Sequence, residues 1–210
     1  MTTDPRDAPP DRPDSDDRAA GSVPADLHGD PRAIESAVLE AVAATGEPFE
    51  VIEVDPALAD TAAFCAHYGY PPEISGNCIV VASRDDPPVL VACLALATTK
   101  LDVNAVVRRR LGVRKASFAP AELTRSATGM EIGGVTPFGL TNVQPARYVD
   151  GVAQRPEPGT MPLWVDSRVA DLDRVIVGGG SRRLKISTTP AALIAAGGEF
   201  IDDLAVPLDA

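Results

Sequence analysis

The sequence predicts a single α+β (mixed α/β) domain in which helices flank a mixed central sheet. Apolar runs typical of strands alternate irregularly with the three- and four-residue apolar spacing of helices, without a regular strand–helix–strand repeat. The chain has 210 residues, 45% of them apolar and 23% charged, which is enough for one core without a disulfide or metal.

The first 30 residues differ from the rest in composition. They hold eight aspartates, three arginines and five prolines, but almost no large apolar side chains. Such a segment cannot bury enough surface to offset the entropy of ordering. We therefore expect a disordered acidic leader over residues 1–30, with an acidic interaction tail as the alternative, and one domain over residues 31–206.

The first half of the domain is expected to alternate helices and strands. Asp-Pro at the start of the second helix and Asp102 at the start of the third are N-cap signals, and a glycine follows each of these helices. In chain order we expect a helix from Pro31 to about residue 45, a strand at Phe49–Val54, a helix from residue 55 to about Tyr68, a hairpin of Cys78–Ala82 with Val89–Ala97, and a helix from residue 102 to 111.

Shorter elements are expected in the second half. They are a helix at Pro120–Thr128, strands at Leu163–Val165, Arg174–Val177 and Leu184–Ile186, a helix at Ala191–Ala196 and an edge strand at Phe200–Leu204. Residues 141–161 carry three prolines and little periodicity, so an irregular excursion is expected there.

Charge, cysteines and missing motifs exclude several function classes. The net charge of −11 disfavours a protein that coats nucleic acid by charge alone. No apolar run approaches the ~20 residues of a membrane span, and three cysteines without CxxC spacing indicate reduced thiols in a cytoplasmic protein and no metal site. The phosphate-loop, dinucleotide, nucleophile-elbow and HExxH motifs are absent, so we expect no cofactor.

Two glycine-rich loops are the features most typical of a binding site. One contains the run Gly-Gly-Val-Thr-Pro-Phe-Gly over residues 133–139, and the other contains Gly178–Gly180 after an expected strand. Without Cβ atoms such loops let a ligand approach backbone amides, and Arg182 and Lys185 follow closely enough to meet an anion. Simple turns are the alternative.

Several segments, taken in order, resemble the YbaK/ProX family of aminoacyl-tRNA editing proteins. They are Gly76–Val81, Leu101–Gly112, Thr128-Gly129 with the loop 133–139, Trp164-Val165-Asp166 and Val177–Gly180. The resemblance covers about residues 50–205 and implies a single YbaK-like domain. It also implies hydrolysis of the ester between a wrong amino acid and the 3′ adenosine of a tRNA, with mischarged tRNA as partner and an aminoacyl-tRNA synthetase as a further candidate partner.

The resemblance also implies which residues bind the substrate. It assigns the wall of the amino-acid pocket to the loop from Gly133 to Pro137 and the approach to the terminal adenosine to the second loop. The candidates are Gly133, Gly134, Thr136 and Pro137 in the first loop and Gly178, Gly179, Gly180, Ser181 and Arg182 in the second. Arg182 or Lys185 would meet a phosphate.

The catalytic candidates are Asn77 and Lys100. Many family members carry a functional lysine in a Phe-Lys-Thr element, and Asn77 stands at the matching position. An amide can orient water or bind a carbonyl oxygen but brings no positive charge, so Lys100 is considered as a compensating cation, with a solvated surface lysine as the alternative.

These features predict an aminoacyl-tRNA deacylase that acts in trans. An aminoacyl ester is already activated, so a positioned water and backbone amides suffice without a protein nucleophile. Because the family lysine is replaced, a non-catalytic module that binds aminoacyl-tRNA or a synthetase is the main alternative. A small-molecule ester or amide hydrolase is the third.

Overall fold

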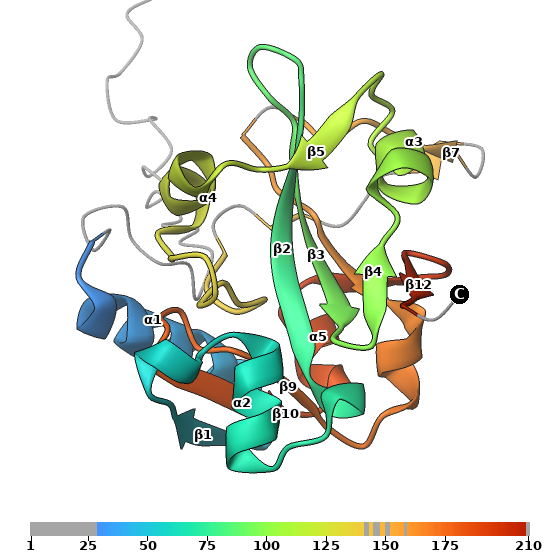
Figure 1. Ribbon diagram of the computed structural model, residues 1–210. Coiled ribbons are helices and arrows are strands. Elements are labelled where there is room, and N and C mark those ends of the chain that lie inside the picture. The colour runs from blue at the N-terminus through green and yellow to red at the C-terminus, as the bar shows by residue number, and fades with distance from the viewer. Residues whose placement is uncertain (1–28, 141–142, 145–147, 150–151, 158, 209–210) are drawn as a thin grey trace, which may run out of the picture.

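The computed structural model describes residues 29–140, 143–144, 148–149, 152–157 and 159–208 (Figure 1). The expected leader therefore lies almost wholly outside the described residues. Asp30 is described, and its carboxylate accepts a hydrogen bond of 3.0 Å from the Arg32 amide as the N-cap of helix α1 (Pro31–Ala43). No helix among the described residues is long and apolar enough to cross a membrane.

A mixed five-stranded sheet forms the centre of the fold, as expected. Its strand order is β11-β8-β3-β2-β5. The strands are β2 (Gly76–Ser83), β3 (Leu90–Leu96), β5 (Ala116–Phe118), β8 (Leu163–Asp166) and β11 (Gly198–Ile201). β2 pairs antiparallel with β3 and β5, whereas β3, β8 and β11 run parallel, which confirms both the hairpin and the mixed sheet.

Three expected strands form a second sheet of their own. These are β1 (Phe49–Glu53), β9 (Val175–Gly178) and β10 (Leu184–Thr188), antiparallel in the order β1-β10-β9. A single parallel bridge between Ser75 and Ile176 joins this sheet to the central one. Its two faces differ, because Ile186 packs in the same cluster as the buried face of α1 while Ile176 packs with residues of α2 (Thr61–Tyr68).

The second expected helix is two helices. A 3₁₀ turn at Pro56–Leu58 is capped by Asp55, and α2 begins anew at Thr61 after Asp60, whose backbone is extended. Buried Ala59 joins the cluster around Phe64, which fixes the turn between the two helices. As a result, α2 has its own N-terminus at Thr61, where one continuous helix would have had a mid-helix residue.

The remaining helices are short. A π-helical turn at Val103–Val107 leads into α3 (Arg108–Arg110), followed by α4 (Ala121–Thr128) and α5 (Pro190–Ala195), with 3₁₀ turns at Pro72–Ile74 and Ser167–Asp171. Arg108 and Arg109 donate to the backbone oxygens of residues 104 and 105.

Two further strand pairs were not expected. β4 (Thr99–Leu101) pairs with β12 (Ala205–Pro207), and β6 (Tyr148–Val149) pairs with β7 (Val152–Ala153) inside the excursion, part of which lies outside the described residues. An edge strand was expected at residues 200–204. The structure has β11 there instead, which begins at Gly198 and ends at Ile201.

Candidate active site

A cavity of about 350 Å³ lies where the two sheets meet. Strand β5 pairs with β2 only at residues 81–83, so the first half of β2 is left uncovered on that side, and Gly76–Val80 form one wall. The N-terminus of α2, the end of β5, Thr124 of α4, residues of both glycine loops and Lys185 complete the lining. The volume suits a small-molecule or nucleotide-end ligand.

Asn77 lines this cavity, and a residue of α2 holds its side chain in place. It is half-buried on β2, and the Thr61 hydroxyl donates a hydrogen bond to its Oδ1. Within the part of the chain that the structure describes, the Asn77 Nδ2 group has no protein partner. The amide is therefore oriented by Thr61 and keeps its N–H donors for a ligand.

Lys185 is a second polar residue inside the cavity. Its side chain is only 6% exposed, and Nζ lies 4.9 Å from the centre of the Phe64 ring. Burial lowers the pKa of the Lys185 ammonium; Cys65 and Asp60 raise this pKa and Arg182 lowers it further, all by smaller amounts.

Asp60 and Arg182 lie together at the rim. Arg182 Nη1 is 3.3 Å from Asp60 Oδ1, and Arg182 Nε donates to the Pro56 carbonyl over 3.1 Å. Asp60 lines the cavity with a side chain that is 74% exposed, whereas Arg182 itself is not part of the lining. The ion pair is thus solvent-screened and marks the entrance rather than the interior.

The two glycine-rich loops pack against each other. The Gly180 amide donates to the Gly134 carbonyl over 2.8 Å, and a Cβ on Gly178 would stand 2.4 Å from the Val135 carbonyl oxygen. Gly133 and Gly178 line the cavity, while Gly134, Gly179 and Gly180 are outside the lining. Gly134 and Gly179 pack closely on the chain at Ser181 and Leu184, whereas a Cβ on Gly180 would meet the Val38 and Ile34 side chains of α1, so packing rather than approach of a ligand accounts for these three.

Three other candidates lie outside the cavity lining. Thr136 and Pro137 are buried within the first loop, and the Thr136 hydroxyl has no hydrogen-bond partner among the described residues. The Ser181 hydroxyl donates to Glu35 of α1 and accepts from the Arg183 amide, so it fastens the second loop to that helix.

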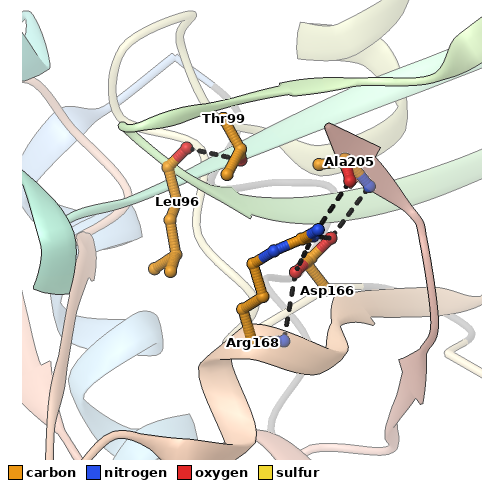
Figure 2. A network of polar contacts seen from close by, with 5 residues as sticks. All are labelled: Leu96, Thr99, Asp166, Arg168 and Ala205. Atoms are coloured by element: carbon orange, nitrogen blue, oxygen red, sulfur yellow. Dashed lines mark hydrogen bonds and ion pairs between the residues drawn. The ribbon is translucent and has the colours of Figure 1, made fainter. Parts of the chain in front are cut away.

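Lys100 is on a different part of the molecule. It is exposed on β4, opposite Val206 of β12, and outside the cavity lining. This edge is held by the buried Asp166 carboxylate, which accepts hydrogen bonds from Arg168 and from the Ala205 amide (Figure 2). The structure therefore does not bring Lys100 to Asn77.

The Cys78 thiol is not a nucleophile at neutral pH. Cys78 lines the cavity, but burial raises the pKa of its thiol to about 12, so it stays protonated. His67 is exposed and outside the lining. No group of three or more His, Cys, Asp or Glu side chains suited to a metal occurs among the described residues. The lining thus offers an amide, hydroxyls and one amine for chemistry, with the Asp60 carboxylate at the rim.

The family follows from the sequence match and the fold together. The family model described as the aminoacyl-tRNA editing domain matches residues 55–196, more than half of the chain. The chain belongs to this family. The resemblance drawn from the sequence is thereby confirmed.

Solved structures share this editing-domain fold. A crystal structure described as a candidate trans-editing enzyme for prolyl-tRNA synthetase has a TM-score of 0.62 at 20% identity, with 80% of this chain and 95% of that chain covered. The hypothetical protein APE2540 has a TM-score of 0.63 at 21% identity, with 80% and 99% covered. At such identities the likeness concerns the fold.

Sequence reasoning missed several residues that line the cavity of this editing domain, including Asp60, Thr61, Phe118 and Thr124. Neither Thr61 nor Phe118 lies in a sequence motif that could have identified it as a site residue. Lys185 was expected near an anion beyond the second loop, but the structure buries it in the cavity wall. The available signal was a single lysine inside the otherwise uncharged strand Leu-Lys-Ile-Ser-Thr.

Proposed function

We propose that this protein is an aminoacyl-tRNA deacylase that removes a wrong amino acid from tRNA in trans. The observation that carries the proposal is the cavity that Asn77, held by Thr61, lines together with Gly133 and Gly178. Family membership favours an aminoacyl ester as the bond that is cleaved.

The reaction needs few protein groups. A water oxygen attacks the ester carbonyl carbon, the carbon–oxygen bond to the ribose breaks, and a proton from the water ends on the ribose oxygen. The free Nδ2 of Asn77 is placed to donate a hydrogen bond to the ester carbonyl or to the attacking water. Positioning an already activated ester in this way supplies much of the rate enhancement.

The cavity walls favour a small amino acid at the 3′ end. Ile132, which is 55% exposed, and Val135 line it beside Gly133, and apolar side chains at this place limit the size of the amino acid that fits. Phe118 lines the same cavity with 55% of its surface exposed, which gives the terminal adenine an aromatic face for stacking. We therefore favour alanyl-, seryl- or cysteinyl-tRNA as substrates, with tRNA-Pro as the first carrier to examine.

The second candidate function is a non-catalytic module that binds the aminoacyl-tRNA end or a synthetase. Asn77 favours it, because an amide lacks the charge that the lysine of many family members supplies. Under this alternative the cavity binds the substrate without turnover.

A panel of mischarged and correctly charged tRNAs separates the two functions. We expect the wild-type protein to release amino acid from selected mischarged tRNAs, and Asn77→Ala to lower the single-turnover rate about tenfold or more. Asn104→Ala, at an exposed position outside the cavity, is the matched control and keeps the wild-type rate. Binding of the same tRNAs with no release by the wild type would favour the module.

A further inference from the structure

Lys185 is the one buried lysine of the three in the chain. Lys100 and Lys115 are exposed, whereas Lys185 is 6% exposed. Strand alternation explains the placement, since Ile186 packs in the core cluster shared with α1 and its neighbour Lys185 lies against Phe64 of α2. The side chain thereby enters the cavity that also contains Asn77.

The surroundings of Lys185 do not neutralise its charge. The titratable and charged groups around it are Asp60, Cys65 and Arg182. Asp60 is paired with Arg182, and the Cys65 sulfur lies 3.3 Å from the Ser75 hydroxyl. Among the described residues Lys185 forms no ion pair or hydrogen bond through Nζ, and the contact described for its ammonium is the Phe64 ring.

An unpaired buried ammonium is costly to the fold. Desolvation of the charge is offset here only by a cation–π contact, and a lowered pKa is the expected result. An apolar side chain of the same length would fill this place at lower cost. Such groups occur where a site uses the charge, and the cavity gives this charge access to a ligand.

We propose that Lys185 is a catalytic residue of the deacylase, whose ammonium stabilises the oxyanion that forms on the ester carbonyl. The inference rests on the proposed function. It also explains how Asn77 can stand where many family members have a lysine. The neutral Asn77 amide on β2 binds and orients the substrate, and Lys185 on β10 supplies the positive charge.

The step keeps Lys185 protonated throughout. When the water oxygen bonds to the carbonyl carbon, the carbonyl electron pair moves onto oxygen, and the ammonium lies against that negative charge. When the oxyanion collapses, the bond to the ribose oxygen breaks and the proton released by the water passes to that oxygen. Because the pKa of Lys185 is lowered, activity is expected to fall with rising pH at lower pH than an ordinary lysine would allow.

The test compares Lys185→Met, Lys185→Arg and the exposed control Lys115→Met. We expect Lys185→Met to lower the single-turnover deacylation rate about 100-fold or more with an unchanged or higher Tm, because the variant removes a desolvated charge. Lys185→Arg should restore part of the rate and move the alkaline fall in rate to higher pH. Lys115→Met should match the wild type in rate and Tm.

A binding measurement makes the test independent of folding and turnover. One ligand is an aminoacyl-adenosine analogue with an anionic phosphonate in place of the ester, and we expect Lys185→Met to bind it at least tenfold more weakly than the wild type does. The other ligand is the neutral 3′-amide analogue, which both proteins should bind equally well. Equal losses for both analogues, or an active wild type with an equally active Lys185→Met, overturn the inference alone. A wild type inert on every charged tRNA overturns the proposed function and the inference with it.

Discussion

At the scale of single residues, burial decides the chemistry of the cavity. Lys185 and Cys78 are both in its wall, and burial acts on them in opposite directions: it lowers the pKa of the ammonium and raises the pKa of the thiol. Each shift favours the neutral form. The Cys78 thiol therefore stays neutral, and Lys185 is the group whose charge the proposed step uses.

The Cys78 thiol predicts a pH dependence of stability. Its pKa in the folded chain, about 12, is above the ordinary value of 9.0. The stability that the protonated thiol contributes is therefore fully present below pH 9 and is lost as pH rises toward 12. Between pH 8 and pH 10, wild-type protein should lose about 1.4 kcal/mol more unfolding free energy than Cys78→Ala. Urea unfolding at both pH values measures the difference, and equal losses would contradict the assignment.

At the scale of elements, the break between residues 58 and 61 matters most. The sequence predicts one continuous helix there, because apolar periodicity continues across the break and cannot reveal it. The hairpin of β2 and β3 was predictable from its long apolar runs, whereas β4 and β12 are three residues each and too short for any periodic signal. The break is what brings Thr61 to Asn77.

Thr61 therefore acts as a positioning residue across two elements. Thr61→Val keeps the shape but removes the hydroxyl, and we expect the deacylation kcat to fall about five- to tenfold with little change in KM. Thr61→Ser should restore the wild-type kcat. Steady-state kinetics on a mischarged tRNA measures both parameters, and an effect on KM alone would show that the hydroxyl does not orient Asn77 for the reaction.

At the scale of the whole molecule, the site forms where two sheets meet. Apolar runs predict the central sheet and glycines mark the two loops that contain Gly133 and Gly178, whereas the resemblance to the editing family is what marked Asn77; all three residues line the cavity. The sequence could not place Lys100 or Thr136, since the pairing of β4 and the packing of the loops are long-range contacts that leave no local pattern.

The closure of the fold far from the cavity depends on Asp166. Its buried carboxylate bonds to Arg168 and to the Ala205 amide, which attaches β12 to the end of β8 (Figure 2). Asp166→Ala should lower the free energy of unfolding by about 3 kcal/mol, because Arg168 and the Ala205 amide lose their partner. Exposed Asp173→Ala is the control in urea unfolding. Equal stabilities of the two variants would contradict this role.

Turnover by a substoichiometric amount of wild-type protein is the measurement that decides whether this protein is a deacylase. We expect one protein molecule to release many amino acids from alanyl-, seryl- or cysteinyl-tRNA-Pro while correctly charged prolyl-tRNA stays intact. Release of no amino acid from any of these tRNAs, under conditions where the protein binds them, would contradict the proposed function.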